Sequence, residues 1–231
     1  MAKSEFYDRD FFENNQTTSR GSATAMIPAI LELIQPRSVV DVGCGIGEFL
    51  RAFQEHNVNE ILGIDGEYVD RSLLAIPQEN FKAADLAKPF KLNRTFDLAL
   101  CLEVAEHVAS ENALDFIESL TRLAPVILFS AAIPLQGGVH HVNEQWPEYW
   151  MQLFRARGFV PVDGLRKRIW CNHDIAIWYR QNALLFCTEY ALACNSTLAE
   201  EARATNESML SVVHPELYLL GYKTPRPPAL S

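Results

Sequence analysis

Three glycines at alternate positions, Gly43, Gly45 and Gly47, separate two segments of different character. The residues before them, 38–42, are rich in valine, which is typical of a buried parallel strand. The residues after them, 48–53, place their apolar side chains on one face of a helix. Glycine allows a positive φ and close approach of a ligand, and a helix N-terminus offers N–H groups. The pattern therefore predicts a cradle for a cofactor.

The spacing of the glycines narrows the kind of cofactor. A dinucleotide-binding G-x-G-x-x-G motif would place its third glycine at position 48, which is Glu48. The G-K-S/T tripeptide of a P-loop does not follow either. A carboxylate at the start of the helix would also repel a pyrophosphate. These observations disfavour both phosphate-binding motifs.

A second predicted strand, residues 60–65, ends on an acid about 20 residues after the glycine turn. In a doubly wound fold, a carboxylate at this place binds the ribose hydroxyls of a nucleotide. Asp65 could instead be an ordinary turn residue. The order of strand, glycine turn, helix, strand and acid favours ribose binding by Asp65.

The segment 134–147 concentrates His140, His141, Asn143 and Glu144 within five positions, after the Gly137-Gly138 pair. One interpretation is a capped helix, with Asn143 as N-cap and Glu144 in the first turn. A second is acid–base catalysis, because a histidine with a pKa near ~6.5 can accept a proton at neutral pH. A third, a metal site of His140, His141 and Glu144, is disfavoured because adjacent histidines point in different directions. We predict His141 as the base, then His140, and no metal.

The sequence pattern predicts alternating strands and helices, and these elements must position the residues named above. Strands are predicted at 38–42, 60–65, 81–86, 96–102, 126–133, 167–178 and 183–188, and helices at 23–34, from 48, at 114–123 and from 146. The series predicts an α/β fold, Rossmann-like and doubly wound, with a mostly parallel seven-stranded sheet and helices on both faces. Ligands of such sheets bind beyond the carboxyl ends of the strands.

Composition and charge limit the possible functions further. The 231 residues suit one domain, and the net charge of −9 gives no basic surface for nucleic acid. The five cysteines include no C-x-x-C pair, which indicates free thiols in a reducing compartment. We find neither a signal peptide nor an apolar run of membrane-spanning length, and we expect a cytoplasmic protein.

Two of these motifs resemble those of the bacterial class I S-adenosylmethionine-dependent methyltransferases. Residues 41–47 resemble the D-x-G-x-G-x-G motif of that family, and residues 96–108 resemble its fourth-strand motif. The run V-N-E-Q-W-P-E-Y-W at 142–150, followed by R-G-F, is similar to a group of small bacterial methyltransferases. The resemblance covers roughly residues 23–188 and implies S-adenosyl-L-methionine as cofactor, released as S-adenosyl-L-homocysteine.

The resemblance also implies roles for individual residues. In the family, an acid after the third strand binds the adenine amino group and the next residue's backbone meets a ring nitrogen, here Asp85 and Leu86. Arg20 could reach the carboxylate of the cofactor, although a solvated arginine is the simpler interpretation. The expected cofactor-binding residues are Arg20, Asp41, Gly43, Cys44, Gly45, Gly47, Asp65, Gly66, Asp85, Leu86 and Glu103. The expected substrate-binding residues are Tyr7, His107, Asn143 and Trp146, and the expected catalytic ones are His140, His141 and Glu144.

The sequence therefore predicts methyl transfer by in-line displacement to a small-molecule acceptor, an oxygen of a sugar, polar metabolite or natural-product intermediate. The alternatives are N-methylation of a small molecule, a nicotinamide-dependent reductase and a non-catalytic cofactor-binding protein. We expect an N-terminal arm over the site at 1–22, the methyltransferase domain at 23–188 and an extension at 189–231. No nucleic acid or membrane partner is expected, and a homodimer is left open.

Overall fold

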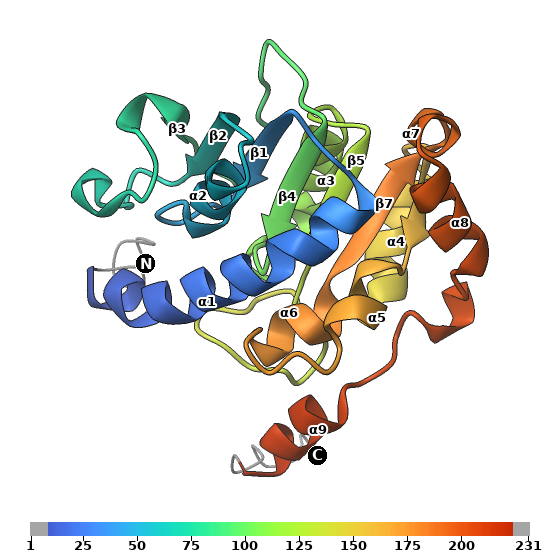
Figure 1. Ribbon diagram of the computed structural model, residues 1–231. Coiled ribbons are helices and arrows are strands. Elements are labelled where there is room, and N and C mark those ends of the chain that lie inside the picture. Colours follow the sequence, from blue (N-terminus) through green and yellow to red (C-terminus); the bar gives the residue numbers. More distant parts are fainter. Residues whose placement is uncertain (1–8, 224–231) are drawn as a thin grey trace.

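The computed structural model describes residues 9–223, and their seven strands form one sheet (Figure 1). The strand order is β3-β2-β1-β4-β5-β7-β6. All neighbouring strands are parallel except that β7 runs antiparallel to β5 and to β6. The strands are β1 (Ser38–Val42), β2 (Glu60–Asp65), β3 (Phe81–Ala83), β4 (Leu98–Leu102), β5 (Val126–Ser130), β6 (Phe159–Val162) and β7 (Leu184–Thr188). The predicted fold class is confirmed.

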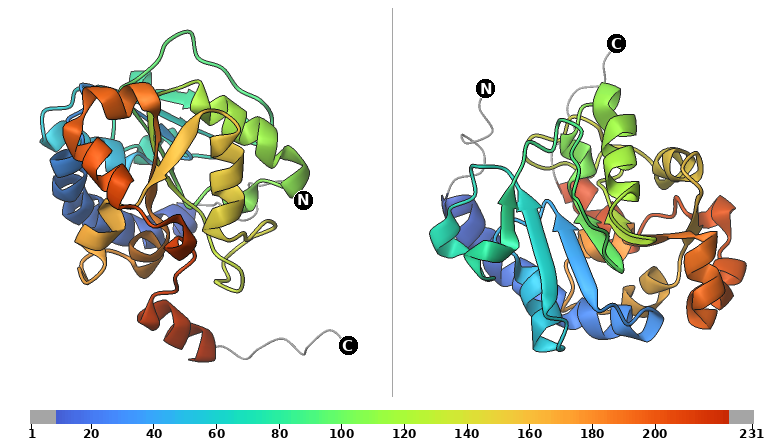
Figure 2. Two further views of the ribbon diagram at one scale, coloured as in Figure 1. Left: turned by 90° about the vertical axis from the view of Figure 1, so that its right-hand side faces the viewer. Right: turned by 90° about the horizontal axis from the view of Figure 1, so that it is seen from above.

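Helices cover both faces of the sheet, as Figure 2 shows for α1 on one side and α3 and α4 on the other. One apolar cluster joins the sheet to α1, α2, α5 and α6, and a second joins it to α3 and α4. The helices are α1 (Arg9–Leu33), α2 (Glu48–Glu55), α3 (Ala113–Thr121), α4 (Pro147–Arg155), α5 (Leu165–Ile169), α6 (Ile177–Asn182), α7 (Glu189–Cys194), α8 (Ser196–Ala204) and α9 (Pro215–Lys223). None of the helices within residues 9–223 is both long and apolar enough to cross a membrane.

Strand alternation explains why the central strands are apolar throughout. Val39 packs into the α1 and α2 cluster, whereas its neighbour Val40 packs into the α3 and α4 cluster. The same alternation separates Leu100 from Cys101 in β4. Successive side chains of a strand point to opposite faces, so a strand covered on both faces has no polar side.

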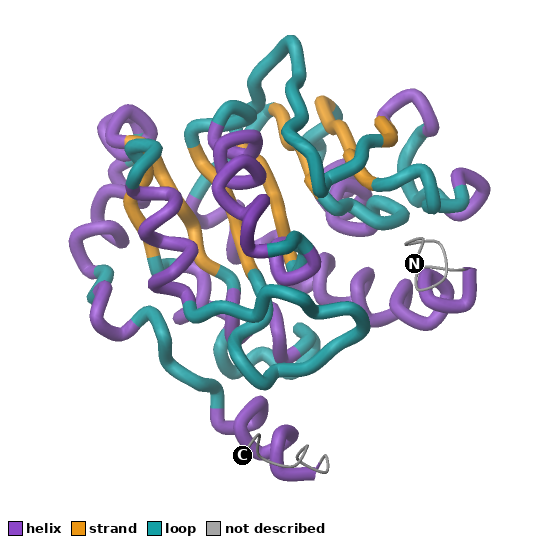
Figure 3. The backbone as a smooth tube through the Cα atoms, turned by 180° about the vertical axis from the view of Figure 1, so that it is seen from behind, coloured by secondary structure: helices purple, strands orange, loops and turns teal. Residues whose placement is uncertain are grey.

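The order of the strands determines where a ligand can bind. From β1 the chain continues to β2 and β3 on one side of the sheet, and then crosses to β4 on the other side. Such a reversal of strand order opens a crevice at the carboxyl ends of the two central strands. The loop 131–146 between β5 and α4 lies at this end of the sheet (Figures 1 and 3).

The predicted strand at 167–178 is wrong. These residues form most of α5, a connecting segment and the first turn of α6. The sixth strand is instead β6, whose four residues at the edge of the sheet include Pro161. Proline lacks the N–H of a ladder and is tolerated at a sheet edge, so its presence made this short strand hard to recognise.

The N-terminal segment is also more regular than expected. The helix predicted from residue 23 begins at Arg9, and Pro28 lies inside it. The same helix places Ser19 at the wall of the cavity described below, and an N-terminal arm over the site at 1–22 stays a prediction. Tyr7, one of the predicted substrate-binding residues, lies outside the described residues.

The C-terminal extension packs as short helices before it leaves the sheet. Residues 196–204 form the helix α8. The final helix, α9, lies apart from the sheet in Figure 1, and Glu216 ties it to the domain through a 2.7 Å ion pair with Arg180 of α6.

Candidate active site

The glycine turn after β1 has the backbone conformation that its composition predicts. Gly43, Gly45 and Gly47 have φ angles of 81°, 53° and 90°, which side-chain-bearing residues rarely adopt. A Cβ built at Gly43 would lie 2.3 Å from the Val104 side chain. Gly47 is the N-cap of α2. The turn therefore depends on glycine both for its φ angles and for the space that it leaves.

A cavity of about 550 Å³ opens beside this turn, at the carboxyl ends of β1 and β4. Its size is within the range of small-molecule sites. Residues from the turn, from the segment after β4, from the loop after β5 and from α6 line it. The predicted site residues that line it are Asp41, Gly43, Cys44, Gly45, Glu103, His107 and His141. The structure thus brings the predicted cofactor and catalytic segments to one cavity.

The wall of the cavity is acidic. Asp41, Glu48, Glu103 and Glu106 line it, and among the described residues no lysine or arginine does. Burial, and then the charge of Asp65, raise the pKa of Asp41 to about 7. Such a wall favours a ligand that carries positive charge over an anion.

Asp65 has a structural role that the sequence did not indicate. Its carboxylate accepts hydrogen bonds from the backbone N–H of Gly45 (2.7 Å) and of Gly66 (2.6 Å). The Tyr68 hydroxyl donates a third, at 2.6 Å. The end of β2 therefore holds the glycine turn in place. Ribose binding by Asp65 stays a prediction, and it would require the carboxylate to exchange some of these donors for ribose hydroxyls.

Several other predicted residues lie outside the lining of the cavity. Arg20 is exposed, Leu86 is buried, and the half-exposed Asp85 pairs with Lys88 at 3.0 Å. Their predicted contacts with the cofactor stay predictions. The other predicted residues outside the lining are Gly47, Asp65, Gly66, His140, Asn143, Glu144 and Trp146.

Glu103 is held at the cavity by two residues that the sequence analysis missed. The amide of Gln136 donates to one carboxylate oxygen at 3.0 Å, and that of Asn182 donates to the other at 3.1 Å. Glu103 itself has a φ of 55°, an unusual value for a residue other than glycine, which is often found at functional sites. Burial raises its pKa above the usual glutamate value.

Glu106 was also missed by the sequence analysis. Its side chain is fully buried at 0% exposure. Its backbone carbonyl accepts the N–H groups of Val142 and Asn143, which ties the loop after β5 to the segment after β4. Burial, and then the charge of Glu103, raise the pKa of Glu106 well above the usual value.

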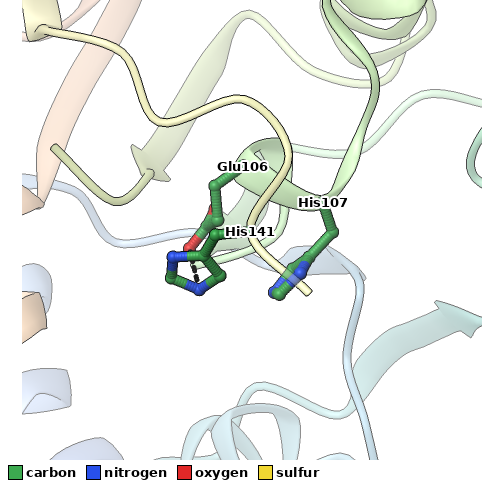
Figure 4. A group of neighbouring side chains, drawn as sticks. All are labelled: Glu106, His107 and His141. Atoms are coloured by element: carbon green, nitrogen blue, oxygen red, sulfur yellow. Dashed lines mark ion pairs between the residues drawn. The ribbon is translucent and has the colours of Figure 1, made fainter. Parts of the chain in front are cut away.

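The hydrogen bonds between the loop after β5 and the carbonyl of Glu106 bring two histidines together (Figure 4). The rings of His107 and His141 lie 4.9 Å apart between centroids, and His141 Nε2 lies 3.9 Å from Glu106 Oε1. His141 Nδ1 lies 2.9 Å from Glu144, and His107 Nδ1 lies 3.1 Å from the carbonyl of His140. In each histidine the acceptor at Nδ1 assigns the proton to that nitrogen, which leaves the lone pair on Nε2.

The capped-helix interpretation of this segment is wrong. Trp146, which is 42% exposed, occupies the N-cap position of α4, and the acid in its first turn is Glu148. Asn143 is buried and accepts a hydrogen bond from the side chain of Gln145. Glu144 instead accepts the N–H groups of Leu135 and Gly137, each at 2.8 Å. These contacts close the loop on itself and hold His141.

The ring paired with His141 is that of His107, not that of His140. His140 has a φ of 60° and an exposed side chain, and its carbonyl lies 3.1 Å from His107 Nδ1. His107 takes the place beside His141 that the sequence had assigned to His140. A residue 34 positions earlier in the chain could be found there only through the strand order.

Comparison with known proteins shows to which family the chain belongs. A family model described as a methyltransferase domain matches residues 18–168. No curated protein matches the chain.

Solved structures with the same fold include three methyltransferases. The sugar N-methyltransferase KedS8 from a Streptoalloteichus species is 17% identical, with a TM-score of 0.58 over 79% of this chain and 93% of its own. The plantazolicin methyltransferase BpumL in complex with SAH is 18% identical, with a TM-score of 0.55 over 81% and 94%. Magnesium protoporphyrin IX methyltransferase from Synechocystis with bound SAM is 20% identical, with a TM-score of 0.52 over 76% and 80%. The family model covers more than half of the chain and the sheet has the matching fold, so the chain belongs to the class I S-adenosylmethionine-dependent methyltransferases.

Proposed function

We propose that this enzyme methylates an oxygen atom of a small-molecule acceptor. The observation that carries the proposal is the pair of His141 and Glu144, 2.9 Å apart, on the loop that faces the glycine turn across the cavity. A hydroxyl group must lose its proton as it is methylated, and a histidine held by a carboxylate is a suitable acceptor for that proton.

The chain offers a fitting cradle for the cofactor. Gly43, Cys44 and Gly45 line the cavity with backbone that leaves room for a ligand, and Asp41 adds negative charge. When bound, S-adenosylmethionine would supply a methyl group attached to a positively charged sulfur. The acceptor oxygen would form a bond to the methyl carbon, and the electron pair of the broken carbon–sulfur bond would remain on sulfur. The acidic wall fits this positive charge.

The residues of the chain then have three tasks. His141 takes the hydroxyl proton on Nε2, and Glu144 stabilises the resulting imidazolium through Nδ1–H. Glu103 is fixed by Gln136 and Asn182, so it can hold a polar group of either ligand in one orientation. The loop that carries His141 excludes water from the methyl group and aligns the acceptor, and most of the acceleration comes from this positioning.

The cavity supports a small acceptor. Its volume of about 550 Å³ lies within the range of sites that bind small molecules. Trp178 and Tyr179 line the same cavity and offer aromatic surface for a ring or a sugar face. The acceptor classes named for similar folds, a sugar, a porphyrin and plantazolicin, support the same size range.

The proposal is tested in two steps. Calorimetric titration with S-adenosylhomocysteine is expected to give micromolar binding, and NADH is expected to give none. Incubation with methyl-labelled S-adenosylmethionine and a panel of alcohols, phenols and amines then identifies the acceptor atom. Labelled methyl ethers would support the proposal. Label on amines alone would establish N-methylation, as named for the similar KedS8.

Cofactor affinity is expected to rise with pH because of Asp41. Its pKa of about 7 means that it gains negative charge between pH 6 and pH 8, and the charged form attracts the sulfonium. If the carboxylate stays ionised in the complex, linkage gives an increase of up to about tenfold in S-adenosylmethionine affinity over this interval. S-adenosylhomocysteine lacks the positive sulfur and is expected to change less. Calorimetry at both pH values with both ligands checks this, and equal slopes would contradict it.

A further inference from the structure

We propose that Glu106, His107 and His141 form a binding site for a divalent first-row transition-metal ion, placed to bind the oxygen of the acceptor. One ligand atom of each residue lies within 4.8 Å of the other two. All three residues line the cavity. The binding of the ion is independent of the proposed function, and only its use on an acceptor oxygen rests on it.

The strongest sign of a missing ligand is Glu106. Its side chain is fully buried, and neither carboxylate oxygen has a hydrogen-bond partner among the described residues. His141 Nε2 lies 3.9 Å from one of these oxygens (Figure 4). The backbone N–H groups of Glu106 and Ala132 lower the pKa of the carboxyl group, but neither carries a charge. A buried carboxylate is costly unless it is paired or bound to a metal. The cluster therefore has the acceptor atoms for a cation.

The surroundings of both histidines are those of metal ligands. His141 Nδ1 lies 2.9 Å from the Glu144 carboxylate, and His107 Nδ1 lies 3.1 Å from the His140 carbonyl. Metal-binding histidines usually donate one ring N–H to a carboxylate or carbonyl, which orients the ring and leaves the other nitrogen for the ion. Both contacts come from the loop after β5, so one loop orients both rings.

The geometry requires a modest contraction of the cluster. Ligand atoms at about 2.0–2.2 Å from one ion lie roughly 3–3.5 Å from one another. The largest separation here is 4.8 Å, so side-chain rotations that move each atom by about an ångström would close the site. Gly138 gives the His141 ring the space it occupies, because a Cβ there would lie 2.2 Å from Nε2.

The donor set indicates the kind of ion and what it would do. Two imidazole nitrogens and one carboxylate oxygen suit Zn²⁺, Mn²⁺, Fe²⁺ or Co²⁺ better than Mg²⁺, which prefers oxygen alone. Three protein ligands leave at least one position open. A hydroxyl bound there would lose its proton to water more readily, because the positive ion stabilises the alkoxide. In the metal-bound form His141 is a ligand and water takes the proton, whereas in the metal-free form His141 is the base of the proposed function.

The test measures metal binding directly. Protein dialysed against EDTA, with the exposed Cys171 and Cys194 blocked by alkylation, is titrated with Zn²⁺ by calorimetry and with Co²⁺ by visible absorption. We expect one ion per chain, and at least about tenfold weaker binding for each of Glu106→Gln, His107→Ala and His141→Ala. The matched control is His173→Ala, since His173 is exposed and pairs only with Glu216 among the ion pairs described. It is expected to bind the ion as the unaltered chain does.

Two outcomes would overturn the site: no binding by the unaltered chain, or equal binding by the control and the three variants. The same samples are titrated with S-adenosylhomocysteine, which reports folding and the cofactor cradle separately. Binding of this ligand without binding of metal would overturn the metal site and leave the proposed function standing. Binding of metal without binding of S-adenosylhomocysteine would support the metal site and overturn the proposed function.

Discussion

Replacing His141 with alanine is expected to lower the rate of methyl transfer by ~10²-fold or more and to leave cofactor affinity nearly unchanged. The ring lies on the loop after β5, near Glu144 and Glu106, whereas the glycine turn at which we propose that the cofactor binds follows β1. Loss of the ring removes the proton acceptor, or the metal ligand, without touching the turn. Single-turnover rates and S-adenosylhomocysteine calorimetry measure the two effects separately.

Two further variants sharpen this experiment. Glu144→Gln keeps one of the two oxygens that accept the N–H groups of Leu135 and Gly137, and it removes the charge that faces His141. We expect a smaller loss than for His141→Ala. His173→Ala, at an exposed position paired with Glu216, controls for the loss of a histidine as such. Unaltered turnover of His141→Ala with the natural acceptor would exclude this residue from catalysis.

Replacing Gly43 with alanine is expected to destabilise the fold and weaken cofactor binding together. A residue with a side chain at φ 81° costs ~1–2 kcal/mol in strain, and the new Cβ would overlap the buried Val104 at 2.3 Å, which costs a further ~1–3 kcal/mol. The sum, ~2–5 kcal/mol, corresponds to a fall in melting temperature of roughly 5–15 °C for a chain of this length. Because the same turn lines the cavity, we also expect S-adenosylhomocysteine to bind at least ~10-fold more weakly.

Gly137→Ala is the matched control for this substitution. Gly137 has a similar φ of 73°, but a Cβ there would have no atom within 4 Å. It should therefore show the strain alone, at about 1–2 kcal/mol. Thermal unfolding of both variants compares them, and equal melting temperatures would show that the contact with Val104 has no energetic cost.

Local patterns were enough to predict most of the framework. The buried valines of β1, the glycines after them and the order of the strand–helix units are properties of short segments, and the structure has them where the sequence predicts them. The errors lie where a short segment is ambiguous. Residues 167–178 contain apolar side chains that suit either a strand or a helix, and β6 has only four residues with a proline among them. Packing against the sheet decided both.

The candidate site shows the same division between local and tertiary information. The sequence by itself determined the glycine turn after β1 and the presence of a histidine-bearing loop, because glycine conformation and residue spacing are local properties. Only the tertiary structure decided that His107, not His140, lies beside His141, that Glu106 is buried between strand end and loop, and that Asn182 reaches Glu103. These partners come from segments up to 79 positions apart, and the strand order that brings them together is set by the burial of the whole sheet.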